Sequence, residues 1–162
     1  TGIEIHPITG VLHVMFYRRQ PPQDTFLGAV DPSTGALTFG PKVTGAGNPE
    51  AIAINSQGVM IMSQASGQKY FQLDYQTGVA TLIGNTAIPN SICQDLAFDS
   101  QDRLWGVFGD WGGGPHSGIY EIDLSAMTTT KLISTTKYYF GIAFTRDTAV
   151  KSRTRLPSIA KQ

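Results

Sequence analysis

The sequence has little charge, one cysteine and no long apolar run, and each shortage excludes a class of protein. A single cysteine, Cys93, cannot form an intrachain disulfide or a cysteine-cluster zinc site. Charged residues make up 15% of the chain, and twelve Lys and Arg balance twelve Asp and Glu, which argues against a basic nucleic-acid-binding surface. No apolar stretch approaches the ~20 residues that span a bilayer as a helix. We therefore expect neither a nucleic-acid partner nor a membrane span.

The remaining composition is typical of one folded domain rich in turns. The chain has 162 residues, of which 41% are hydrophobic and 10% aromatic, which argues against a disordered chain. Eighteen glycines and nine prolines indicate frequent turns. The low charge and the many small polar residues favour an extracellular or periplasmic location. Because the sequence starts at Thr1 rather than Met, we expect a processed product or a fragment.

A unit of two short apolar strands joined by a polar turn recurs four times. Its first apolar residues are separated by 49, 44 and 46 positions. Strand-like alternation within the copies and the absence of a sustained helical period predict an all-β fold. The copies are GIEIHPITGVLHV from Gly2, AIAINSQGVMIM from Ala51, DLAFDSQDRLWGV from Asp95 and GIAFTRDTAV from Gly141.

A second unit follows each of the first three copies and contains a turn with an aspartate. The units read FLGAVDPSTGALTFG, YFQLDYQTGVATLIG and GIYEIDLSAMTTTKLIS, with Asp31, Asp74 and Asp123 aligned. The aspartate side chain can cap the turn, and Gly35 and Gly78 supply a positive φ. The third copy lacks this glycine, so we expect a different turn there.

Four strands per repeat of about 40–50 residues predict a β-propeller, with a β-sandwich as the alternative. We expect four-stranded blades at 2–43, 51–84 and 94–134, and the first strand of a fourth blade at 139–145. These blades make up a domain at 1–147, and a basic C-terminal tail follows at 148–162. Since propellers have about four to eight blades, this ring is incomplete. Its expected partners are further blades from the same or another chain.

Family resemblance supports this fold without giving a function. The units AVDPSTGALTFG and QLDYQTGVATLIG, each followed by AIAINSQG or DLAFDSQDRLWGV, resemble bacterial and archaeal secreted β-propeller repeat proteins of the NHL, YVTN and quinoprotein-like superfamily. The resemblance covers residues 2–147. That class includes enzymes, binding modules and structural proteins, so the resemblance implies a fold alone.

Two segments on the side of the longer loops are candidate binding sites. Asp110, Trp111 and His116 lie in a glycine-rich loop, where an exposed indole would suit a glycan or protein partner. Arg18 and Arg19 end a strand and could bind an anion or an acidic partner. The alternatives are that Trp111 packs back on its blade and that the two arginines are simply solvated.

Carboxylates near the expected ring axis raise the question of a metal. Glu4, Glu50 and Asp95 lie at or near the innermost strands, and Glu4 replaces an alanine found in the other copies. Calcium needs six to eight oxygen ligands, however, so we expect no cofactor and keep calcium as the alternative. No catalytic motif is present in the sequence, and Cys93 is expected to be a buried structural thiol.

The favoured interpretation is a non-enzymatic extracellular binding or structural module that belongs to a larger ring or assembly. One alternative is a fragment of a propeller enzyme, such as a lactonase-like hydrolase, a lyase or a quinoprotein-type dehydrogenase. A second alternative is a carbohydrate-binding lectin.

Overall fold

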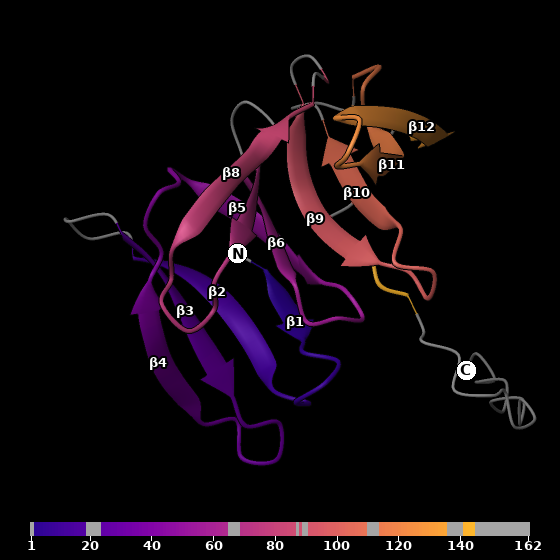
Figure 1. Cartoon of the computed structure of the whole chain (residues 1–162). Coiled ribbons are helices and arrows are strands. Elements are labelled where there is room, and N and C mark those ends of the chain that lie inside the picture. Colours follow the sequence, from indigo (N-terminus) through magenta and orange to yellow (C-terminus); the bar gives the residue numbers. More distant parts are fainter. Residues whose placement is uncertain are drawn as a thin grey trace, which may run out of the picture.

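The chain forms three separate antiparallel sheets of four strands each (Figure 1). The computed structural model describes residues 2–18, 24–64, 69–86, 88, 91–109, 114–135 and 141–144. All regular structure within these ranges is β-strand. The described part of the chain has no helix long and apolar enough to cross a membrane.

Each sheet is a meander in which consecutive strands pair, and we name the sheets blades 1 to 3. Blade 1 consists of β1 (Ile3–Ile5), β2 (Leu12–Arg18), β3 (Asp24–Val30) and β4 (Leu37–Lys42). Blade 2 consists of β5 (Pro49–Ile54), β6 (Met60–Gln64), β7 (Lys69–Leu73) and β8 (Ala80–Asn85). Blade 3 consists of β9 (Ile92–Phe98), β10 (Leu104–Gly109), β11 (Gly118–Asp123) and β12 (Thr128–Ser134).

The structure confirms the predicted blades over the β-sandwich alternative. All twelve expected strands are present, and the first strands of the three blades, β1, β5 and β9, contact one another in that order. The sheets do not close into a ring. The expected start of a fourth blade is only partly described, and residues 141–144 have no strand assignment. The tail at 148–162 lies outside the described residues.

The aspartate turns form as their sequence predicts. Asp31 Oδ1 accepts hydrogen bonds from the amide and the hydroxyl of Ser33, at 2.8 and 2.7 Å. The turn closes because the Gly35 amide, at a φ of 71°, donates to the Asp31 carbonyl at 2.7 Å. Asp74 and Gly78 repeat this arrangement, with a φ of 76° at the glycine.

The expectation of a different turn in the third copy is wrong. Asp123 Oδ1 again accepts from the amide two residues on, that of Ser125, at 2.8 Å. Met127 stands in the position of the glycine and adopts a φ of 53°. Such a conformation is unfavourable for a residue with a side chain. The Met127 side chain packs on Gly84 of β8, where an added Cβ would lie 2.8 Å from it, and this contact with blade 2 helps to offset the strain.

Two hydrophobic clusters join the blades face to face. The cluster between blades 1 and 2 contains Met15, Leu27, Val43, Ile52, Ile54, Met60, Met62, Phe71, Leu73 and Ala80. The cluster between blades 2 and 3 contains Ala51, Ala53, Ile61, Tyr70, Ile88, Cys93, Leu96, Leu104, Phe108, Tyr120 and Ile122. Alternate residues of β5 and β6 therefore enter opposite clusters, as the period of two requires.

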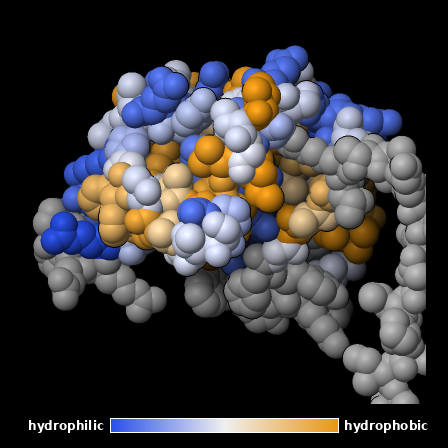
Figure 2. All heavy atoms as spheres, turned by 90° about the horizontal axis from the view of Figure 1, so that it is seen from below, coloured by the Kyte–Doolittle hydropathy of each residue, from blue (hydrophilic) through white to orange (hydrophobic). Residues whose placement is uncertain are grey.

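The first strand of blade 1 exposes positions that the first strand of blade 2 buries. Ile3 pairs with Val14 just as Ile52 pairs with Met62, so the two isoleucines occupy equivalent places. Ile3 is 59% exposed, whereas Ile52 is fully buried against blade 1. Figure 2 shows hydrophobic residues across the middle of the surface seen from below. The outer face of blade 1 comprises Ile3, Ile5, Leu12, Val14, Phe16, Phe26, Val30, Leu37 and Phe39.

The equivalent isoleucines give a matched test of blade packing. Ile52→Ala should lower the free energy of unfolding by about 2–5 kcal/mol, because it leaves a cavity between blades 1 and 2. Ile3→Ala should cost less than about 1 kcal/mol in the single chain, because its side chain is largely solvated. Urea denaturation at low protein concentration measures both. Equal losses for the two variants would contradict this assignment of the faces.

Candidate functional site

A hollow lies at the inner ends of blades 1 and 3. Its volume is about 850 Å³. β1 and the turn after it form one wall, whereas β9 and residues 141–144 form the other. Its polar side chains are Glu4, His6 and Asp95. We call this hollow the axial groove, because the first strand of a propeller blade lies next to the ring axis.

Asp95 joins blade 3 to the segment 141–144. Its Oδ2 atom accepts a hydrogen bond from the Ile142 amide at 2.9 Å. Partial burial raises the pKa of the Asp95 carboxyl, and hydrogen bonds from the backbone amides of Ile142 and Leu96 oppose this rise. A half-buried carboxylate with a raised pKa in a concave site is a feature that binding and catalytic sites share.

Two of the three carboxylates that the sequence places near the expected axis line one hollow. Glu4 and Asp95 line the axial groove together, from blades 1 and 3, whereas Glu50 is not among its lining residues. Within the described ranges, no three His, Cys, Asp or Glu side chains are grouped so that they could hold a metal ion. Calcium binding therefore stays a prediction.

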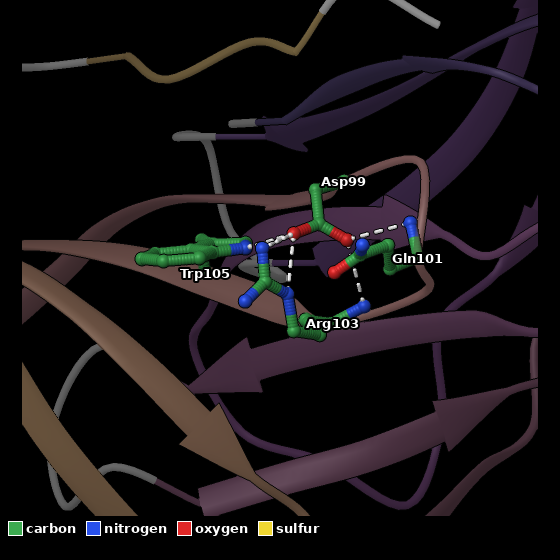
Figure 3. A network of polar contacts seen from close by, with 4 residues as sticks. All are labelled: Asp99, Gln101, Arg103 and Trp105. Carbon is green, nitrogen blue, oxygen red and sulfur yellow. Dashed lines mark hydrogen bonds and ion pairs between the residues drawn. The ribbon is translucent and has the colours of Figure 1, made fainter.

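A polar network around Asp99 fixes Trp105 beside the axial groove (Figure 3). Asp99 Oδ2 accepts from the indole Nε1 of Trp105 at 3.0 Å and from Nε of Arg103 at 2.7 Å. Asp99 Oδ1 accepts from the amides of Gln101 and Arg103, which shapes the turn between β9 and β10. Although burial alone would raise it, these hydrogen bonds hold the pKa of Asp99 below its ordinary value.

The fixed indole is the platform on which the segment 141–144 rests. The guanidinium carbon of Arg103 lies 5.2 Å from the centre of the Trp105 ring. The Phe144 ring lies 5.7 Å from the indole and is tilted by 47°. Phe144 and Ile142 thus hold the segment to blade 3 through one ring contact and one hydrogen bond.

Two histidines and a tyrosine meet between blades 1 and 2. The rings of His6 and His13 each lie 5.2 Å from the ring of Tyr75, which comes from the turn after β7. His6 Nδ1 accepts hydrogen bonds from the amides of Ile8 and Thr9 at 3.3 Å. Burial lowers the pKa of His13, and the nearby His6 lowers it further. The folded chain therefore favours the neutral form of His13.

Cys93 is a buried thiol, as expected, on the blade 2 side of β9. Its side chain is fully buried in the cluster between blades 2 and 3. Burial raises the pKa of Cys93 to about 12. Because the thiolate is the reactive form, this residue is a poor nucleophile at neutral pH.

The sequence-predicted binding residues are only partly described. Arg18 is exposed at the end of β2. His116 lies before β11, where its carbonyl accepts a hydrogen bond from the Tyr120 hydroxyl at 2.9 Å. The two residues belong to different blades. Arg19, Asp110 and Trp111 lie outside the described residues, so the two proposed binding segments stay predictions.

Sequence reasoning missed the Asp99 network and Tyr75. The segment DSQDRLW held the signal for the first, because an aspartate that caps a turn can also reach the side chains of the strand that follows. No sequence signal connects Tyr75 to the two histidines, since the three residues come together through packing between blades.

No protein-family model matches the sequence, and no curated protein matches it. Solved structures do match. A fungal alcohol oxidase of the AA5 family, in complex with copper, has a TM-score of 0.50 and 20% identity, over 80% of this chain and 29% of that one. Hydrazine synthase from Kuenenia stuttgartiensis has a TM-score of 0.48 and 17% identity, over 80% of this chain and 34% of that one.

The similarity to the alcohol oxidase concerns the fold alone. The chain spans about a third or less of the length of either structure. The class of protein that the fold defines is an all-β protein with three four-stranded sheets arranged as propeller blades.

The neutral His13 makes the chain sensitive to acid. The pKa of His13 in the folded chain lies below the ordinary value of 6.5. Its contribution to the free energy of unfolding is therefore fully present above about pH 6.5, and it is lost at lower pH because the unfolded chain takes up more protons than the folded chain. His13→Phe keeps a ring against Tyr75 and removes this proton uptake. We expect a flatter dependence of unfolding free energy on pH between 7.5 and 5, measured in urea.

A matched substitution on another blade controls for the loss of any histidine. His116→Asn should leave the pH dependence as it is in the wild type. The assignment fails if His13→Phe keeps the full acid sensitivity.

Proposed function

We propose that the chain is a non-enzymatic binding or structural module that contributes three propeller blades to a larger ring. The observation that carries this proposal is the outer face of blade 1. In its first two strands that face repeats the apolar pattern that blade 2 buries against its neighbour, as Ile3 and Ile52 illustrate. Apolar faces of this extent on soluble proteins mark interaction sites.

The aromatic centre of that face supports an interaction role. Phe16 stacks on Phe26 at 5.9 Å and meets Phe39 edge-on at 5.2 Å. Leu37 and Phe16 close over Gly28, where an added Cβ would lie 2.8 and 3.2 Å from them. These side chains form an ordered apolar surface, and Phe39 is nevertheless 70% exposed. Aromatic side chains of this kind dominate the energetics of interfaces.

We place the binding of a further protein or glycan on the side of the blades opposite to the aspartate turns. A polar hollow of about 450 Å³ lies there between blades 1 and 2. The ion pair of Lys42 with Asp24, at 2.5 Å, forms part of its wall together with Tyr17 and Asn48. Arg18 follows Tyr17 at this end of β2. An extracellular location, in line with the low charge of the chain, completes the proposal.

An apolar fluorescent dye tests the proposal in single chains. At dilutions where sedimentation shows only single chains, the wild type should bind the dye on blade 1. Phe39→Lys should reduce this binding at least about twofold, because it places a charge in the aromatic centre. Leu82→Lys is the control, since Leu82 has the equivalent register position on blade 2. Without dye binding by single chains, the open face and the proposed function fall together.

A segment of a propeller enzyme is the second candidate function. The observation in its favour is the axial groove, where Glu4, His6 and Asp95 line one hollow and the Asp95 pKa is raised by burial. Titratable groups gathered in a concave site are typical of active sites. The finer suggestions of a lactonase-like hydrolase, a lyase or a quinoprotein-type dehydrogenase belong to this candidate.

Mass spectrometry of the purified protein under native conditions distinguishes the two functions. The enzyme candidate expects a bound metal or organic cofactor that is lost in Asp95→Asn, because the substitution removes the charge at the axial groove. The non-enzymatic module expects the same mass in the wild type and in the variant, apart from the substitution itself. Gln101→Glu, which changes a charge outside the groove, controls for unspecific cation binding.

A further inference from the structure

We propose that the outer face of blade 1 is the docking surface for blade 3 of a second copy of this chain, so that two copies close head to tail into one ring. The inference rests on the proposed function and names the source of the missing blades. Two copies of three blades give six, which lies within the range of about four to eight that propellers use.

Blade 3 already holds a segment whose sequence resembles the strand that begins each blade. The segment Gly141–Ile142–Ala143–Phe144 matches the Gly2–Ile3–Glu4–Ile5 segment of β1 in its spacing of apolar residues. It rests on the outer face of blade 3, through Ile142 on Asp95 and Phe144 on Trp105. The outer face of blade 3 therefore accepts a segment with the pattern Gly-Ile-x-apolar.

The contact of this segment repeats the contact between blades 1 and 2. Gly2, Ala51 and Asp95 are equivalent, because each precedes the first aligned apolar residue of its copy. A Cβ added to Gly2 would lie 2.7 Å from the Ile52 amide nitrogen. Asp95 approaches the amide nitrogen of Ile142, the residue equivalent to Ile52, with its carboxylate. Residues 141–144 thus lie on blade 3 as β5 lies on blade 1.

The first strand of a second copy fits this place better than the segment does. Residues 141–144 are held by the hydrogen bond from the Ile142 amide to Asp95 and by the contact of the Phe144 ring with Trp105. β1 brings the same pattern at the edge of a complete four-stranded sheet, whose outer face is apolar from Ile3 to Phe39. In the ring, β1 of the second copy takes the place of residues 141–144 on blade 3.

The opposing faces are also compatible in polarity and charge. Blade 3 offers Trp105 and Ile119, which the pairing of β10 with β11 places on one face together with Glu121, and Ile133 next to them on β12 is 52% exposed. The chain has a formal net charge of zero, so two copies meet without long-range repulsion. A head-to-tail contact of this kind closes into a ring where the rotation between subunits allows it.

The solution mass of the full chain tests the inference. Sedimentation over a range of concentrations should show single chains of 17.5 kDa in equilibrium with a species of about twice that mass. Phe39→Lys should weaken the dimer at least about tenfold, whereas Leu82→Lys at the equivalent position of blade 2 should leave it unchanged. Phe144→Asp should strengthen the dimer, because it releases residues 141–144 from Trp105.

Mixing two variants tests the head-to-tail geometry itself. Phe39→Lys disables the blade 1 face, and Ile133→Lys disables the blade 3 face. Each variant alone lacks an intact interface and should stay a single chain. Their mixture has one intact interface in each pair and should regain dimers, which a contact between two identical faces would not give.

Three results overturn the inference. The first is that the wild type and Phe144→Asp both stay single chains at all concentrations. The second is a dimer whose stability Phe39→Lys leaves unchanged. The third is that the mixture of Phe39→Lys and Ile133→Lys contains only single chains. If single chains still bind the apolar dye through blade 1, a second copy is excluded as the occupant of that face, and the proposed ring module stands. If they bind none, both proposals fail.

Discussion

Face-to-face packing of one four-stranded sheet on the next is the constraint on which the rest of this molecule depends. Side chains alternate along a strand, so each blade presents two faces, and both become apolar when a blade stands between two others. Blade 2 has this position, and its residues enter both hydrophobic clusters. Blades 1 and 3 have one covered face each. A blade cannot be understood apart from its neighbours, because the apolar residues of one of its faces pack against the next sheet.

The strands and most turns follow from the sequence because they depend on local chemistry. Alternation sets the strands, and an aspartate with a glycine four residues later sets the turn at Asp31 and at Asp74. The same logic failed at Met127, where no glycine is present. There the contact with Gly84 of the neighbouring blade offsets the backbone strain, and no local pattern reports such a contact.

The candidate site was less predictable, because its geometry arises between repeats. The sequence placed Glu4 and Asp95 near the axis, and both do line the axial groove. It gave no sign that Asp99 would orient Trp105 or that Tyr75 would meet two histidines. It also predicted a strand at 139–145, whereas the described part of that range, residues 141–144, has no strand assignment and is held by side chains of blade 3.

Asp95 shows how a blade junction acquires polarity. The equivalent positions hold Gly2, Ala51 and Gly141, all small residues that allow close approach of the next blade. A carboxylate there loses hydration, which raises its pKa and costs free energy unless a donor compensates. The Ile142 amide is that donor. Any strand that replaces residues 141–144 has to present a backbone N–H at the same point, and an inner strand of the same repeat does so by its register. The carboxylate thus selects the kind of partner that blade 3 accepts, while the apolar residues around it supply the affinity.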